Sequence, residues 1–162
     1  MYIDPGPAVG ILKEKNLRLA SAESCTGGLL SKSITDISGA SEVFECGVVA
    51  YANKIKSGLL GVSASSIESL GAVSAAVAEE MARGVRLLAS ADVGVGITGI
   101  AGPSSDNTDK SVGLIYIAVT NGENSSVREL RTGFEADVRD SNRRFAVITA
   151  LDMIVKFIAE NY

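Results

Sequence analysis

The stretch AESCTGG at residues 22–28 places two nucleophilic side chains, Ser24 and Cys25, side by side just before the glycine pair Gly27 and Gly28. A serine hydroxyl is a weak nucleophile until a base removes its proton. The chain contains no histidine, so that base must be a lysine, a carboxylate or a tyrosinate. These residue types point to nucleophilic catalysis without histidine.

A second stretch, YANKIK at residues 51–56, supplies candidate bases in Lys54 and Lys56. A lysine accepts a proton only when it is neutral, which requires a pocket that is shielded from water or already positively charged. Tyr51 could hold the lysine in place or relay protons between lysine and serine. Lys54 is expected at the surface, where most lysines lie.

The residues alone leave the identity of the nucleophile open. A Cys25 thiolate would need a nearby cation or a helix N-terminus, and because adjacent side chains point in different directions, only one of the pair should face a pocket. The glycines after Ser24 would let a substrate approach the backbone, and amides at the start of the helix that follows could hold an oxyanion or a phosphate. The alternative without chemistry is that Ser24 caps a helix starting at Thr26.

Helical and strand patterns alternate along the chain. Helices are predicted at residues 6–15, 26–37, 53–61 (with Asn53 as N-cap), 74–90 and from about 137 onward, and strands at 18–23, 46–52, 92–98, 112–120 and 127–134. The clearest helix opens at Ser74, and its apolar stripe is expected to be buried: Val77, Met81, Val85 and Leu88. The last helix is expected to bury Val147, Leu151, Ile154 and Ile158.

This alternation predicts an α/β fold, a three-layer α/β/α sandwich with a largely parallel or mixed sheet, in one domain over residues 1–162. Ligands of such folds bind beyond the carboxyl ends of the strands. The segments SCTGG, YANKIK and TGIAGP (98–103) follow three successive predicted strands, so the site is expected where they meet. GVGITG (94–99) matches a dinucleotide-binding spacing, but its first two glycines lie inside a strand pattern, so the match is interpreted as accidental.

Composition limits the partners. A net charge of −4 argues against broad binding to nucleic acid or anionic membranes. Two cysteines without histidine do not fit the usual zinc spacings. No metal or other cofactor is expected. The N-terminus lacks the pattern of a signal peptide, and apolar runs are too short to span a bilayer. A cytoplasmic protein with reduced thiols is therefore expected.

Several segments taken together resemble the CinA C-terminal domain family: AESCTGG, GVVAYANKIKSGLLGV, GAVS, GITGIAGP and the KSVG turn. The similarity runs in order from about residue 5 to residue 158. Stand-alone members of this family include the bacterial nicotinamide-nucleotide amidohydrolase. The larger N-terminal domain of full-length CinA proteins has no counterpart in the sequence, so its nucleotide pyrophosphatase activity is not expected.

The resemblance implies hydrolysis of the carboxamide of nicotinamide mononucleotide (NMN) to nicotinate mononucleotide and ammonia. The family's nucleophile, relay and base fall on Ser24, Tyr51 and Lys56. The resemblance further implies a substrate pocket lined by Thr26, Gly27, Gly28, Thr98 and Gly99, a phosphate held by Arg139 and Arg143, and association into a homo-oligomer. Ser111 stands where the family usually has proline, and EADVR (135–139) where it often has Gly-Asp-Arg.

Two alternatives remain beside this hypothesis. The chain could hydrolyse another small amide with the same residues. It could also be a nucleotide-binding or regulatory module without catalysis of its own.

Overall fold

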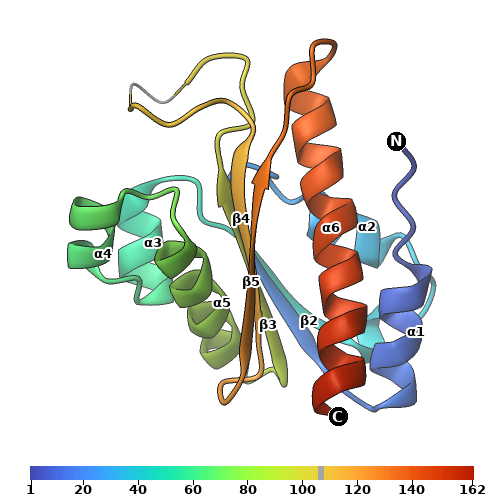
Figure 1. The fold of residues 1–162 in the computed structure, drawn as a ribbon. Helices are drawn as coiled ribbons and strands as arrows, with labels where there is room; N and C mark the ends of the chain where they lie inside the picture. The colour runs from blue at the N-terminus through green and yellow to red at the C-terminus, as the bar shows by residue number, and fades with distance from the viewer. Residues whose placement is uncertain (106–107) are drawn as a thin grey trace.

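The computed structural model describes residues 1–105 and 108–162 and is built around a five-stranded mixed sheet (Figure 1). The strand order is β2-β1-β3-β4-β5. The strands are β1 (Leu19–Glu23), β2 (Phe44–Val49), β3 (Val93–Gly99), β4 (Leu114–Thr120) and β5 (Ser125–Arg131). The first three are mutually parallel, whereas β4 runs antiparallel to both β3 and β5.

Helices cover both faces of the sheet, which confirms the predicted three layers (Figure 1). One layer consists of α1 (Gly6–Glu14), α2 (Leu29–Thr35) and the long α6 (Val138–Asn161). The other consists of α3 (Asn53–Leu60), α4 (Ala64–Leu70) and α5 (Ala75–Ala89). A short 3₁₀ turn, η1 (Ala40–Glu42), precedes β2. No helix in the described ranges is both long and apolar enough to cross a membrane.

The close approach of α5 to β3 explains two glycines of GVGITG. A Cβ on Gly94 would lie 2.1 Å from the Ala82 carbonyl oxygen, and one on Gly96 would lie 2.1 Å from that of Ala78. Both distances are far inside van der Waals contact, so only glycine lets the helix pack this tightly on the strand. These glycines serve helix–strand packing, in agreement with the interpretation that the nucleotide-binding match is accidental.

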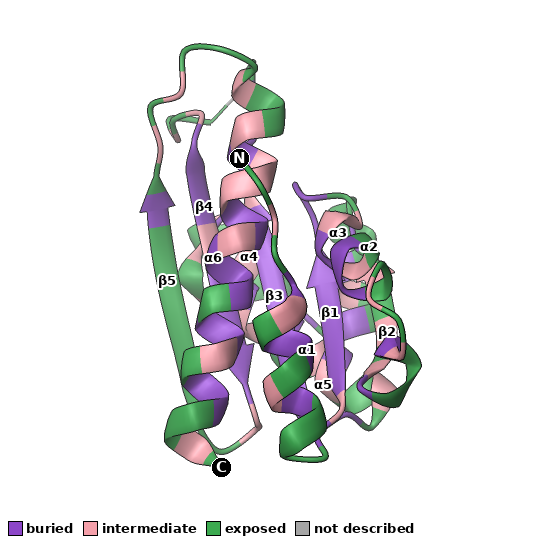
Figure 2. Cartoon of the chain, turned by 90° about the vertical axis from the view of Figure 1, so that its right-hand side faces the viewer, coloured by how far each residue is buried: buried purple, intermediate pink, exposed green. Residues whose placement is uncertain are grey.

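The core fills the space on both sides of the sheet (Figure 2). Strands β1 and β3 are buried almost throughout, as expected for parallel strands covered on both faces, whereas β5 at the edge is largely exposed. The four apolar residues predicted for the last helix are all buried.

Several local predictions need correction. Leu88 of the α5 stripe is 48% exposed, so the buried part of the predicted stripe ends at Val85. The N-cap of α3 is Ala52, not Asn53. Helix α2 begins at Leu29 because Gly27 and Gly28 adopt positive φ angles of 61° and 91°, which turn the chain before the helix can start.

Candidate active site

A cleft of about 510 Å³ opens at the carboxyl ends of the parallel strands. Its lining comes from the loops after β1, β2 and β3, from the connection between α4 and α5, and from the start of α6. The lining residues include Ser24, Cys25, Tyr51, Lys56, Ile67, Ala72, Val73, Thr98, Gly99 and Arg139. The three loops that the sequence singled out therefore meet at one site.

Strand parity decides which way Ser24 points. Successive side chains of a strand face opposite sides of the sheet, and Ala20 and Ala22 pack in the core that also contains residues of α3 and α5. Ser24 continues this alternation, since its backbone N–H still donates to the Ile97 carbonyl of β3 at 2.9 Å. The hydroxyl of Ser24 is thus directed to the side of the sheet where α3 lies.

Lys56 reaches Ser24 from the inner face of α3. It shares this face with Leu60, four residues on, and is only 2% exposed. Its Nζ lies 3.0 Å from Ser24 Oγ, 2.9 Å from the Ala50 carbonyl oxygen and 3.3 Å from that of Tyr51. Lys54, on the outer side of the helix, is exposed as expected.

The surroundings of Lys56 suit a neutral amine. Burial lowers its pKa, because removal from water disfavours the charged form. As an ammonium, Nζ has three hydrogens for its three neighbours. As a neutral amine, it can donate to the carbonyls of Ala50 and Tyr51 and turn its lone pair to the Ser24 hydroxyl. This arrangement can take the proton of Ser24 directly.

Cys25 is not poised to react. It is 6% exposed and packs in the core on the α1–α2–α6 side of the sheet. Burial raises the pKa of its thiol to about 12, and the negative charge of Glu23 acts in the same direction. Since the thiolate is the reactive form of cysteine, the geometry and the pKa together favour Ser24, a choice that the residues alone had left open.

The raised pKa predicts slow alkylation of Cys25. At pH 8 a thiol with a pKa of about 12 is ionised about 10³-fold less than an ordinary cysteine. We expect iodoacetamide to modify Cys25 at least about 100-fold more slowly than free cysteine, as followed by peptide mass spectrometry of the folded protein. Alkylation at the rate of free cysteine would show that the thiol is ionised and would reopen its candidacy as nucleophile.

Glu23 binds amides at the start of α2, the part of the chain where an oxyanion or a phosphate was considered from the sequence. Its fully buried carboxylate accepts from the backbone N–H groups of Gly28 and Leu30, both at 3.0 Å, and of Ser31 at 2.8 Å. It also accepts from the Ser31 hydroxyl at 2.6 Å. The N-terminus of α2 is thus satisfied by an internal anion. These three amides are therefore not free for a ligand, and Ser24 does not cap the helix, whose N-cap is Gly28.

Tyr51 lies at the cleft, where its side chain and its backbone carbonyl make separate contacts. Its side chain is 62% exposed, and its hydroxyl accepts a hydrogen bond from Arg139 Nη2 at 3.2 Å. Its carbonyl oxygen, rather than its hydroxyl, faces the amine of Lys56. Because Lys56 contacts Ser24 directly, proton transfer between them needs no intermediary, and the relay stays a prediction.

The predicted substrate residues divide into two groups. Thr98, Gly99 and Arg139 line the cleft, although the Thr98 hydroxyl donates to the Ala72 carbonyl at 2.8 Å. The other four are not among the described residues that line it: Thr26, Gly27, Gly28 and Arg143. Thr26 is fully buried, and its carbonyl oxygen binds the guanidinium of Arg143. Arg139 therefore faces the cleft whereas Arg143 binds the Thr26 carbonyl, so the two side chains do not converge on one phosphate site.

One part of the cleft lining, the connection between α4 and α5, was not predicted from the sequence. Lys110 holds this connection in place by donating to the carbonyls of Leu70 and Val73, both at 2.6 Å. Lys110 is the first residue of the KSVG turn, which was recognised in the sequence. Nothing in the sequence indicated which carbonyl oxygens the Lys110 amine binds. Within the described ranges, no group of three or more His, Cys, Asp or Glu side chains is arranged to hold a metal ion.

The fold and the site together define a class: an α/β/α sandwich domain with a buried serine–lysine pair beyond the carboxyl ends of parallel strands. The family model of the CinA C-terminal domain matches residues 7–158. The chain therefore belongs to this family.

Relatives and solved structures agree with the assignment. A CinA-like protein from Desulfovibrio desulfuricans is 47% identical over 148 residues, which are 91% of this chain and 35% of that protein. The chain thus spans about a third of the length of the curated relatives it matches. Among solved structures, the competence/damage inducible protein CihA from Agrobacterium tumefaciens is 35% identical, with a TM-score of 0.86 over 96% of this chain and 98% of that one. The competence damage-inducible protein A from Klebsiella pneumoniae is 25% identical, with a TM-score of 0.92 over 98% and 96%.

Proposed function

We propose that this domain is an amidohydrolase that converts NMN to nicotinate mononucleotide and ammonia. The observation that carries the proposal is the hydrogen bond between Lys56 Nζ and Ser24 Oγ, 3.0 Å long and buried at the cleft. Membership of the CinA C-terminal domain family supports the choice of reaction. The cleft volume of about 510 Å³ lies in the range of small-molecule sites.

The mechanism follows from the two side chains. Ser24 Oγ attacks the carboxamide carbon while neutral Lys56 takes the hydroxyl proton. The resulting ammonium of Lys56 then protonates the amide nitrogen, and the C–N bond breaks to release ammonia and leave an ester on Ser24. Water, deprotonated by the neutral lysine, attacks the ester, and Ser24 Oγ leaves with the proton that Lys56 returns.

Arg139 is the cleft residue best placed to hold the phosphate. It lines the cleft and is exposed, and its Nη1 donates to the Gly102 carbonyl at 2.8 Å, while Nη2 contacts Tyr51. These two contacts fix the guanidinium across the cleft from the loop after β3 to the loop after β2. A guanidinium held in this way suits a phosphate dianion.

Incubation of the purified chain with NMN tests the proposal. We expect stoichiometric ammonia and nicotinate mononucleotide, measured by a coupled ammonia assay and by mass spectrometry, and no product with the Ser24→Ala variant. Faster release of ammonia from another small amide would shift the substrate and keep the reaction. Tight binding of NMN without any ammonia would support a nucleotide-binding module and contradict catalysis.

A further inference from the structure

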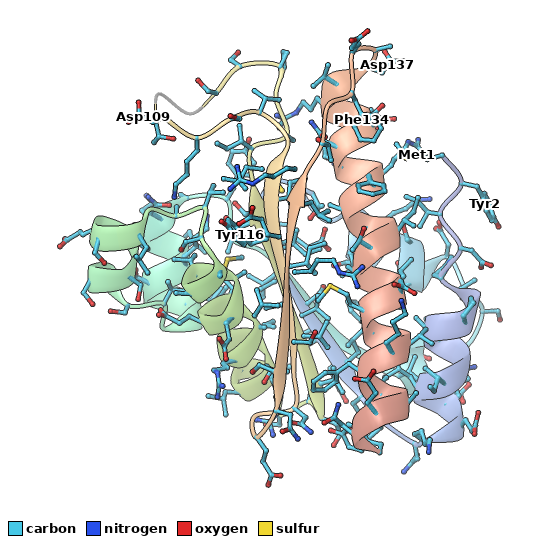
Figure 3. All side chains as sticks on the ribbon, in the orientation of Figure 1. Met1, Tyr2, Asp109, Tyr116, Phe134 and Asp137 are labelled. Atoms are coloured by element: carbon cyan, nitrogen blue, oxygen red, sulfur yellow. The ribbon has the colours of Figure 1, made fainter. Side chains whose placement is uncertain are left out.

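Asn142 and Arg143, in the first turns of α6, contact two of the loops that line the cleft. Asn142, which is 1% exposed, donates from Nδ2 to the Ala101 carbonyl at 3.0 Å, in the loop after β3. Arg143 donates to the Thr26 carbonyl in the loop after β1. Figure 3 shows that α6 starts near Asp137 at the same end of the molecule as the long loop that carries Asp109. One short stretch of helix thus braces two loops that are far apart in sequence.

Arg143 binds the turn that carries the nucleophile, and it does so with two nitrogens. Its Nε and Nη2 lie 3.2 and 2.7 Å from the Thr26 carbonyl oxygen. Its guanidinium also rests against Gly27, since a Cβ at that position would lie 3.5 Å from Nη2. Thr26 is two residues after Ser24, and the Gly27 N–H donates back to the Ser24 carbonyl at 3.2 Å. A displacement of Thr26 is therefore transmitted to Ser24.

The same turn is also held by Glu23, whose carboxylate binds the amides of Gly28 and Leu30. Glu23 thus fixes the amides at the end of the turn, and Arg143 fixes a carbonyl in its middle. Charge-assisted hydrogen bonds of this kind are about twice as strong as neutral ones. Two charged side chains therefore hydrogen-bond to the backbone of the turn at residues 24–28, and these contacts are in place before any substrate binds.

We infer that Arg143 is a positioning residue: it aligns Ser24 with Lys56 by holding the Thr26 carbonyl, and it does not bind the phosphate of the substrate. The expected effect of Arg143 on the catalytic rate rests on the proposed function. Its expected effect on the geometry of the turn does not. Small misplacements of a nucleophile lower the rate of the chemical step, whereas loss of a phosphate contact weakens binding.

The kinetic test compares NMN with nicotinamide riboside, which lacks the phosphate. For Arg143→Met we expect kcat to fall about 10- to 100-fold, by the same factor with both substrates, and KM for NMN to change less than about threefold. Arg143→Lys should recover part of the loss, since one donor remains. Arg139→Met should instead raise KM for NMN by a larger factor than KM for the riboside. An Arg143→Met defect confined to NMN would overturn the inference.

A second measurement does not depend on activity. We expect backbone amides of residues 25–28 to exchange with deuterium at least about tenfold faster in Arg143→Met than in the wild type. Arg144→Met is the matched control, because Arg144 is adjacent on α6 and pairs with Asp140 at 2.6 Å. Unchanged exchange in Arg143→Met would refute the inference even in an active enzyme. If the wild type fails to hydrolyse NMN, the proposed function fails and the exchange result still decides the role of Arg143.

Discussion

In the Ser24→Ala variant we expect hydrolysis of NMN to fall by about 10⁴-fold or more, because the substitution removes the hydroxyl that contacts the Lys56 amine and would form the covalent intermediate. The thiol of Cys25, the next residue in the sequence, has a pKa of about 12 and packs in the core on the other side of the sheet. Initial rates of ammonia release at saturating NMN, compared with the wild type, give the size of the loss.

The fold should survive this substitution. The amine of Lys56 keeps its hydrogen bonds to the carbonyls of Ala50 and Tyr51 when the serine hydroxyl is removed. A melting temperature within a few degrees of the wild type is expected, so that the loss of activity can be assigned to chemistry.

Cys25→Ala is the matched control for Ser24→Ala, since it removes one sulfur atom from the adjacent position. We expect its activity to stay within about threefold of the wild type, with a modest loss of stability from the smaller buried side chain. The opposite pattern, an inactive Cys25→Ala beside an active Ser24→Ala, would identify the cysteine as nucleophile and contradict the mechanism.

The sequence was sufficient for most of the fold because hydrophobic periodicity reports directly on burial. Prediction from the sequence failed where an element has no buried residue, and where the apolar pattern is the same for both directions of a strand. Helix α4 (Ala64–Leu70) was missed because it contains no buried residue and therefore no apolar stripe. The antiparallel direction of β4 was likewise not predictable, since a buried strand shows the same apolar run in either direction.

The candidate site was predictable to the extent that it follows from topology. Ser24 and Lys56 are 32 residues apart, yet they meet because β1 and β2 are adjacent parallel strands whose carboxyl ends lie at one edge. Glu23 was missed, although a glutamate that ends the buried strand LASAE just before a helix is a usable signal. A carboxylate at that place must find donors, and the helix amides are the nearest ones.

In the Lys56→Arg variant we expect turnover to fall by about 10³-fold, because a guanidinium stays protonated at any working pH and cannot accept the proton of Ser24. Lys56→Met is the second variant, since it retains an unbranched apolar stem and has no titratable group. Both should be measured by ammonia release from NMN. Wild-type activity in either one would remove lysine from the role of base.

The pH dependence of stability gives a test that needs no substrate. The pKa of Lys56 is lowered in the folded state by burial and is near its usual value of 10.5 in the unfolded chain. Between these two values the unfolded state binds more protons, so the contribution of Lys56 makes the free energy of unfolding rise with pH; below the lowered pKa both states are protonated and the contribution is constant. Urea unfolding at a series of pH values should show this rise in the wild type but not in Lys56→Met. Because every other titrating group is common to both proteins, parallel curves would mean that Lys56 is not neutralised by burial, and the proposed base would be lost.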